Sequence, residues 1–481
     1  MRYVYSLNVL SAILAPAMLL AGPGFVTPAE VTVGRNLQMY TNIRLTEHAP
    51  ETGLMVTITS DDPSRLLLSA LPDKPGAKAI TIKVNANYFE TPDFMAQAFS
   101  DNGSVTYTIS APGYESSKGT IKLAQSSLLL VGPFKAPSFS TTPNTSAKMT
   151  VYSALIDAEG KFVMQQSISA GAGDERSAVK VSILSSDPKV GIIPESVLTM
   201  APGDSSMFAE FRPNGNVGTT SLTVKMPAGF SQSKQYAVVK AMVELPGMGL
   251  TGDINLGKDL QVPSFILLGE AAPAKGLDVT LTSSDPKAMV LSASVDKLGS
   301  GSVTIHVPAG EMRIPYFIQG LADSGTINHT ASAPGYRDRV APVYMAPSGI
   351  MVVYSPYGPP DEAEFLRAKA TRDPRAFTVS LKEPSKTHLT LWTVYLDPKT
   401  RRGADITAQR LRPGVVATVN LSSTDPTIAK IESKVTLTGP SEWAMTEFVP
   451  LRAGQTTISV DTPAGFTTPS NAITVTATVK N

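Results

Sequence analysis

The sequence predicts an all-β protein built from four tandem β-sandwiches in the order A-B-A-B. Two short phrases, each present four times, predict this arrangement: a Ser/Thr-Asp-Pro phrase and a Gly-aromatic turn that follows it. The composition agrees with it, because 38 Pro and 36 Gly among 481 residues, with only 17% charged residues, are typical of many turns and few charged helices.

The two phrases define the copies and their order. The Asp-Pro pairs are Asp62-Pro63, Asp187-Pro188, Asp285-Pro286 and Asp425-Pro426, and the turn glycines are Gly113, Gly229, Gly335 and Gly465. The separation from each Asp to its Gly is 51, 42, 50 and 40 residues in turn, so long A copies alternate with short B copies. Asp62 and Asp285 are 223 residues apart, and Asp187 and Asp425 are 238 apart. A two-domain unit duplicated in tandem explains these offsets.

The offsets place the four domains at 30–132 (A1), 133–246 (B1), 247–350 (A2) and 351–481 (B2). Domains of this size can each bury a core of their own. Below, A1, B1, A2 and B2 denote these residue ranges.

The N-terminal residues 1–29 are predicted to be an export signal. Arg2 precedes an apolar stretch from Val9 to Leu20, and Leu19-x-Ala21 fits a small-residue cleavage site. A membrane anchor and a misassigned start are the alternative readings. The chain has no Cys, which excludes a lipid-modified N-terminal cysteine, and residues 472–479 form a strand pattern without an anchor. No later apolar run is long enough to span a membrane. We therefore expect a secreted, periplasmic or cell-surface protein.

The strand before each Asp-Pro phrase alternates between apolar and polar residues. In the first copy Leu54, Val56 and Ile58 share one face, and the last of them lies four positions before Asp62. This period of two predicts a half-buried antiparallel strand, and Pro with its polar neighbours predicts a corner at its end. The turn glycines are expected to supply a positive φ, with the following aromatic residue packed over the sandwich edge. Short strands with turns at this spacing favour Greek-key connections.

The second unit carries an insertion at about 355–377. Met345 lies 222 residues after Leu123, whereas Asp397 lies 240 residues after Asp157. Residues 361–370 form a helix-like run with acidic residues first and basic residues later. A solvated loop helix is the simpler interpretation. A partner-docking element, with Phe365 as a candidate binding residue, is the alternative.

Two segments of B2 resemble bacterial immunoglobulin-like repeats, as found in invasin- and intimin-type adhesins. They are 419–431, which contains Ser423-Thr424-Asp425-Pro426 and then Ile428-Ala429-Lys430-Ile431, and 452–460, which contains Gly454-Gln455-Thr456-Thr457-Ile458-Ser459-Val460. B1 is similar to a lesser degree, and A1 and A2 share the corner. The resemblance implies immunoglobulin-like β-sandwiches outside the cytoplasm, often adhesive or forming a stalk, without catalytic residues.

The residues that could carry chemistry are scattered. His48, His306, His329 and His388 are far apart in the sequence, and no metal, triad or phosphate-loop motif is present. His329 aligns with Tyr107 and is expected in the core. Asp61 and Asp62 could indicate calcium, but a structural corner explains them better. We therefore expect no catalytic residues, no metal site and no cofactor. The net charge of +1 without a basic stripe argues against a nucleic-acid partner.

Trp443 is the best candidate for surface binding. Strand parity, with Phe448 pointing inward, places Trp443 and Met445 on the outer face, whereas Trp392 aligns with Tyr152 and is expected in the core. The alternative is that a loop or neighbouring domain covers Trp443.

The sequence thus predicts a non-catalytic repeat protein that acts as an adhesive, a spacer or an envelope-assembly component. Its partners would be a protein or a glycan at a cell surface, and exposed sheet edges would also allow self-association. The alternative function is a glycan-binding, lectin-like β-sandwich array.

Overall fold

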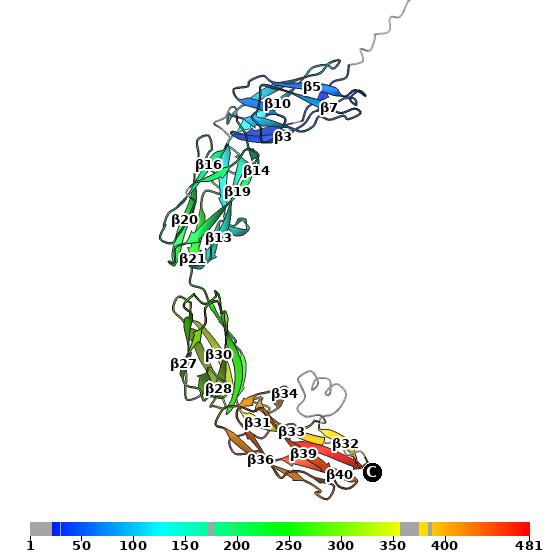
Figure 1. The fold of residues 1–481 in the computed structure, drawn as a ribbon, viewed down its shortest axis with the longest axis vertical. Helices are drawn as coiled ribbons and strands as arrows, with labels where there is room; N and C mark the ends of the chain where they lie inside the picture. Colours follow the sequence, from blue (N-terminus) through cyan, green and yellow to red (C-terminus); the bar gives the residue numbers. More distant parts are fainter. Residues whose placement is uncertain (1–21, 29, 172–177, 196, 356–374, 383–386) are drawn as a thin grey trace, which may run out of the picture. The chain divides into compact units, whose positions relative to one another are not determined.

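The structure is a computed structural model that describes residues 22–28, 30–171, 178–195, 197–355, 375–382 and 387–481. These residues form β-strands joined by turns, with one short 3-10 helix, η1 (Pro133–Lys135), which confirms the predicted all-β class (Figure 1). None of the helical structure in these ranges could cross a bilayer. The chain divides into two compact units, Met1–Glu244 (unit 1) and Leu245–Asn481 (unit 2).

Unit 1 contains two five-stranded sheets of the same strand order, β2-β10-β9-β5-β7 and β12-β21-β20-β16-β18. In each, the first strand runs parallel to the second and all other neighbours are antiparallel. The first sheet comprises β2 (Val31–Gly34), β10 (Ser117–Ala124), β9 (Ser104–Ser110), β5 (Leu54–Ser60) and β7 (Ala79–Val84). The second comprises β12 (Ser138–Thr141), β21 (Val239–Val243), β20 (Gly218–Lys225), β16 (Val179–Ser185) and β18 (Leu198–Met200).

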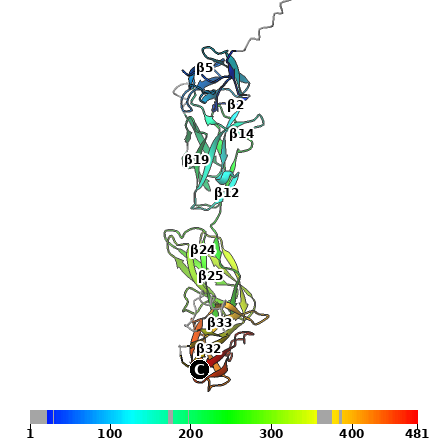
Figure 2. The ribbon, with the colours of Figure 1, turned by 90° about the vertical axis from the view of Figure 1, so that its right-hand side faces the viewer.

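Each of these sheets shares a core with a second sheet in unit 1. In A1 the second sheet is the four-stranded β15-β3-β8-β6, and β1 pairs separately with β4. In B1 it is the five-stranded sheet β11-β13-β19-β17 with β14 paired to β13, and Figure 2 shows β14 and β19 of this sheet. The bounds of these strands are β15 (Ser167–Ile168), β3 (Leu37–Thr41), β8 (Phe94–Ala98), β6 (Leu66–Ser69), β11 (Ser126–Val131), β13 (Ala147–Ile156), β19 (Ser206–Pro213), β17 (Gly191–Ile192), β14 (Phe162–Gln165), β1 (Phe25–Val26) and β4 (Arg44–Leu45). β11 precedes residue 133 and therefore lies in the range predicted for A1. Ile58 and Phe94 lie in the A1 core, and Phe211 and Leu222 in the B1 core.

Unit 2 repeats this arrangement. Its four sheets all have five strands. Two are β23-β30-β29-β25-β27 and β32-β41-β40-β36-β38, and the other two are β22-β24-β28-β26, with β35 paired to β24, and β31-β33-β39-β37, with β34 paired to β33. The A2 strands are β22 (Met248–Leu250), β23 (Ile254–Gly257), β24 (Leu260–Leu268), β25 (Leu277–Ser283), β26 (Met289–Ser292), β27 (Ser302–Val307), β28 (Arg313–Gly320), β29 (Thr326–Ser332) and β30 (Arg339–Ala346). The B2 strands, the first of which begins before the predicted boundary at residue 351, are β31 (Ser348–Ser355), β32 (Ala376–Ser380), β33 (Thr387–Leu396), β34 (Gly403–Ala408), β35 (Arg410–Leu411), β36 (Val416–Ser423), β37 (Ala429–Lys430), β38 (Lys434–Thr438), β39 (Trp443–Pro450), β40 (Gly454–Val460) and β41 (Thr474–Lys480).

The alternating strands bury the face that the sequence predicts. In β5, Leu54, Val56 and Ile58 are buried while Met55 between them is exposed. Burying such a side chain stabilises the fold by about 1.5–3 kcal/mol, which sets the register of each strand. The residues predicted to form an export signal, apart from 22–28, and most of the predicted insertion with Phe365 lie outside the described residues.

Candidate binding surface

All four Asp-Pro corners contain the same hydrogen bond. The Asp carboxylate accepts the backbone N–H of the residue two positions later. The N···O distances are 3.2 Å for Ser64 to Asp62, 3.0 Å for Lys189 to Asp187, 3.0 Å for Lys287 to Asp285 and 2.9 Å for Thr427 to Asp425. Such a turn needs a short carboxylate or amide side chain, and the intervening Pro63, Pro188, Pro286 or Pro426 fixes one φ angle.

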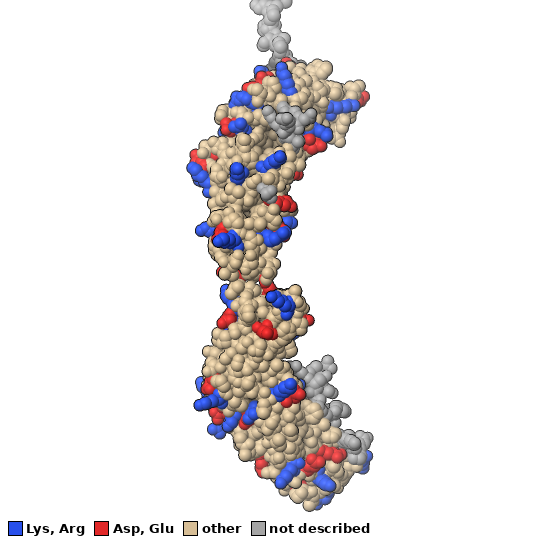
Figure 3. Space-filling view, turned by 60° about the vertical axis from the view of Figure 1, so that its left-hand side comes forward, with Lys and Arg blue, Asp and Glu red and all other residues tan. Residues whose placement is uncertain are grey.

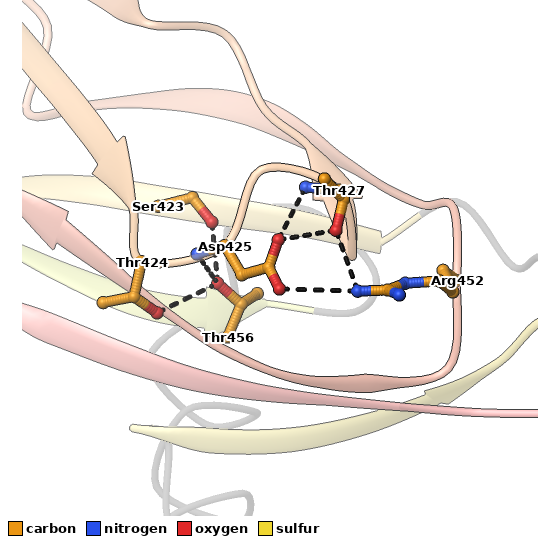
Figure 4. Close-up of polar contacts among 6 residues, drawn as sticks. All are labelled: Ser423, Thr424, Asp425, Thr427, Arg452 and Thr456. Carbon is orange, nitrogen blue, oxygen red and sulfur yellow. Dashed lines mark hydrogen bonds and ion pairs between the residues drawn. The ribbon is translucent and has the colours of Figure 1, made fainter.

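In B2 a threonine from the neighbouring strand ties the corner to the sheet (Figure 4). The Thr456 hydroxyl accepts the N–H of Asp425 at 3.1 Å and lies 2.7 Å from the Ser423 hydroxyl. Asp425 accepts hydrogen bonds from the hydroxyl and from the backbone N–H of Thr427. These bonds, together with the positive charge of nearby Arg452, hold the pKa of Asp425 below its usual value. In B1 the Thr220 hydroxyl takes the place of Thr456 and accepts the N–H of Asp187 at 2.9 Å. The carboxylates of Asp425 and Asp187 thus accept hydrogen bonds within their own turns.

The four Gly-aromatic turns also share one geometry. Gly113, Gly229, Gly335 and Gly465 have φ values of 79°, 85°, 81° and 90°, in the left-handed region that favours glycine. In each turn the backbone N–H of the aromatic residue donates to the carbonyl three residues earlier at 3.2 Å. The aromatic residues that follow these glycines all contact a hydrophobic core, and Tyr114 also stacks on Phe25 with centroids 5.5 Å apart.

Within each unit, a short strand from the B segment extends a sheet of the A segment. In unit 1, β15 pairs with β3 so that Ile168 lies opposite Leu37. In unit 2, β35 pairs with β24 so that Leu411 lies opposite Leu260. All four side chains are buried. Strand pairing and apolar contact thus join A to B in both units.

A buried glutamine adds two hydrogen bonds at each of these junctions. In unit 1, Gln166 accepts the N–H of Gly34 at 2.9 Å and donates to the carbonyl of Thr32 at 2.7 Å. In unit 2, Gln409 accepts the N–H of Gly257 at 3.0 Å and donates to the carbonyl of Asn255 at 2.6 Å. We call the glutamine and the short strand after it the A–B clamp. The repeat pattern of the sequence does not predict this contact, although Gln166-Ser167-Ile168 and Gln409-Arg410-Leu411 are similar phrases.

A third contact at the junction differs between the units. In unit 2, Arg412 donates from Nε and Nη2 to Oδ1 of Asp259, at 3.0 and 2.8 Å. In unit 1 the residue corresponding to Asp259 is Asn36, and both residues have a φ of 62°. A Cβ on Gly229 would lie 2.3 Å from Asn36 Nδ2, so this turn glycine is also required by its close approach to A1.

The candidate Trp443 lies at the start of β39, opposite Trp392 of β33. Trp443 and Met445 are half-buried, whereas Phe448 is buried in the core. Trp392 is also half-buried and packs against a small cluster of Met351, Val394 and Leu396, outside the main core. The expectation that Trp392 is a core residue is therefore wrong. Leu389 and Leu391 occupy the inward positions of β33 near it, so Trp392 faces the other side of the sheet.

The histidines occupy unrelated environments. His329 is buried, and its Nε2 lies 2.7 Å from the Tyr316 hydroxyl. Burial lowers the pKa of His329 to about 4. His306 contacts Asp278 at 2.7 Å on the surface, and His48 contacts the Phe89 ring edge. In the ranges that the structure describes, no three His, Asp or Glu residues are grouped so that they could hold a metal ion.

Charged side chains of both signs are interspersed over the face shown in Figure 3. Many form exposed ion pairs, such as Lys118 with Asp61 at 3.0 Å and Arg212 with Glu210 at 3.0 Å. Exposed pairs of this kind add little stability, so these charges mainly keep the surface solvated.

No protein-family model matches the chain, and no curated protein matches it. Among solved structures, it is similar to the adhesin InvE of Yersinia pseudotuberculosis, with 14% identity and a TM-score of 0.19, over 46% of this chain and 58% of that one. It is also similar to a β-glycosidase from Bacteroides vulgatus, with 10% identity and a TM-score of 0.17, over 46% of this chain and 25% of that one. The chain thus spans less than two thirds of either protein, and neither likeness bears on its function.

Proposed function

We propose that the protein is a non-catalytic, secreted or cell-surface array of four immunoglobulin-like β-sandwiches that acts as an adhesive, a spacer or an envelope-assembly component. Its basic element is an A–B pair, present twice. The observation that carries the proposal is the A–B clamp, which recurs in both units with equivalent backbone groups of the A segment as its partners.

The clamp supports a scaffold role because motion is the usual expectation for domains joined by a linker unless their interface is extensive. Here each B segment adds a strand to the A sheet, buries Ile168 or Leu411 against A, and satisfies two A backbone groups with a buried glutamine. Each such hydrogen bond contributes about 0.5–1.5 kcal/mol net. Both pairs would therefore hold their two sandwiches in a fixed relation.

The proposed location outside the cytoplasm rests on the sequence. It is supported by the signal-like N-terminal residues and by the resemblance of B1 and B2 to bacterial immunoglobulin-like repeats. The proposed partners are a protein or a glycan at a cell surface, and the balanced charge argues against nucleic acid.

The clamp can be tested by electron spin resonance distance measurements on the full chain. Because the chain has no Cys, spin labels at Lys83→Cys in A1 and Lys225→Cys in B1 would be the only labelled sites. Both lysines are exposed. We expect a narrow distance distribution that broadens when Gln166 is replaced by Ala. A distribution that is equally broad with Gln166 intact would contradict the proposal.

The second candidate function, a glycan-binding array centred on Trp443, is supported by two half-buried tryptophans, Trp443 and Trp392, that are register partners on β39 and β33. Saturable binding to a glycan panel that disappears in Trp443→Ala would favour it. Unchanged binding, or retention only on envelope protein, would favour the scaffold.

A further inference from the structure

A second aromatic surface lies on B1, on the outer side of the sheet β11-β13-β19. We call it the B1 outer face and define it by Phe134, Lys135, Lys148, Tyr152 and Phe208. Phe134 is fully exposed and 62% of Phe208 is exposed. Alternate residues of the same strands, Met149, Val151 and Phe211, point the other way and are buried in the B1 core. The outer residues therefore do not serve this core.

Two lysines of the B1 outer face lie over aromatic rings. Lys148 Nζ is 3.5 Å from the centroid of the Phe208 ring, and Lys135 Nζ is 5.8 Å from the centroid of the Tyr152 ring. Within the described residues neither lysine forms an ion pair, and the acid opposite Lys148, Glu210, is paired with Arg212 at 3.0 Å. Each ring holds an ammonium group in place by a cation–π contact and leaves its N–H donors available.

The turn that carries Phe134 is strained. Phe134 and Lys135 have φ values of 56° and 61°, which residues with a side chain rarely adopt. Hydrogen bonds from Gly132 N–H to the Ala136 carbonyl at 2.9 Å, and from Ala136 N–H to the Pro133 carbonyl at 3.1 Å, hold the turn. Glycine would fit both positions at lower cost, so a large exposed aromatic side chain there calls for a role outside the fold.

The corresponding face of B2 shows that the fold does not require these residues. By their register, His388 and Glu447 of B2 correspond to Lys148 and Glu210, and Met445 corresponds to Phe208. The same sheet thus forms without the Lys148–Phe208 contact. The combination of unpaired cations and exposed rings belongs to B1.

We propose that the B1 outer face binds an acidic polysaccharide. The apolar side of a sugar ring would pack on the exposed parts of the Phe208 and Phe134 rings, and its carboxylate or sulfate groups would accept hydrogen bonds from Lys148 and Lys135. Charge complementarity favours an anionic ligand, because neither ammonium group is paired with an acid in the part of the chain that the structure describes. A protein partner is less well matched, since Thr150 and Ser206 separate the rings and leave no continuous apolar area for a desolvated hot spot. The proposal does not depend on the scaffold role.

Affinity electrophoresis of the full chain tests this proposal, with gels that contain polygalacturonate, heparin or, as the neutral control, dextran. We expect retardation by at least one acidic polymer and not by dextran. Phe208→Ala and Lys148→Gln should each weaken binding roughly three- to tenfold, the size expected for loss of one ring or cation contact. Both side chains are exposed, so the variants should keep the wild-type unfolding temperature.

Two matched variants distinguish a site from general charge attraction. Lys225→Gln removes an exposed lysine from β20, and Phe162→Ala removes an exposed ring from β14. Both should bind like the wild type. The proposal is overturned if neither acidic polymer retards the protein, if Lys225→Gln weakens binding as much as Lys148→Gln, or if Phe208→Ala binds unchanged.

Discussion

The Tyr316 hydroxyl lies 2.7 Å from Nε2 of His329, and both side chains are buried in the core of A2. At the corresponding positions A1 has Phe94 and Tyr107, which are also buried. Next to Tyr107 is Gly119, where a Cβ would lie only 2.2 Å from the ring; next to His329 is Ala341. The two A segments therefore fill the same space with different, mutually adjusted sets of side chains.

The His329 side chain should make A2 sensitive to acid. Burial lowers its pKa in the folded state to about 4, from 6.5. Above pH 6.5 the ring is neutral in both states and the stability is complete. As the pH falls from 6.5 toward 4, only the unfolded state takes up the proton, so stability is lost by at most about 1.4 kcal/mol per pH unit, or about 3 kcal/mol in all. Thermal unfolding between pH 4 and 8 would measure this.

The control for the acid effect is His329→Gln, which keeps a polar side chain but cannot titrate. Its unfolding temperature at pH 7.5 will be lower than that of the wild type, but its decline toward pH 4 should be shallower for the transition of unit 2. Parallel pH profiles for the two proteins would show that His329 is not the titrating group.

Gly119→Ala should destabilise A1, because the added methyl group collides with the Tyr107 ring. We expect a loss of about 1–3 kcal/mol in the free energy of unfolding, the usual size for overpacking a core. The triple variant Phe94→Tyr, Tyr107→His, Gly119→Ala reproduces the A2 set and should recover most of the loss. Denaturant unfolding measures both, and an undiminished stability in Gly119→Ala alone would contradict the packing account.

The corner in B2 should depend on the Thr456 hydroxyl, which accepts the N–H of Asp425. Thr456→Val keeps the shape but leaves that N–H without its acceptor, so we expect a loss of roughly 1–3 kcal/mol in stability. Thr436→Val, on the exposed side of β38, is the matched control and should change stability by less than about 0.5 kcal/mol. Equal effects of the two substitutions would show that the hydroxyl has no special role at the corner.

Much of this fold could be predicted because its repeated features are local. In the corner, the Asp accepts the N–H of a residue only two positions later, and in the other turn a Gly supplies the positive φ. Both geometries depend only on residues that are close in the sequence. The A–B clamp has no such local cause. Gln166 and Gln409 bond to backbone groups 132 and 152 residues away, and in the sequence each is one polar residue among many.

Trp392 shows a different limit of sequence reasoning. Its alignment with Tyr152 predicts a core position, yet Tyr152 itself lies on the outer side of its sheet under Lys135. Aligning two copies shows which residues correspond, but it does not show to which side of the sheet their side chains point. The alternation of Leu389 and Leu391 on β33 was the available signal that Trp392 points outward.

Removing the Gln166 side chain should uncouple A1 from B1. Gln166→Ala leaves the Gly34 N–H and the Thr32 carbonyl without partners at a buried junction, which costs roughly 1–3 kcal/mol. Because both groups belong to A1, its edge strand loses the contact that links its unfolding to B1. Calorimetry should then show the unit 1 transition split into two. The neighbouring Gln165, which is exposed and whose side chain donates to Ser205 within B1, is the matched control, and Gln165→Ala should keep a single transition. If Gln166→Ala also unfolds in one step at an unchanged temperature, the two segments are held together without the clamp.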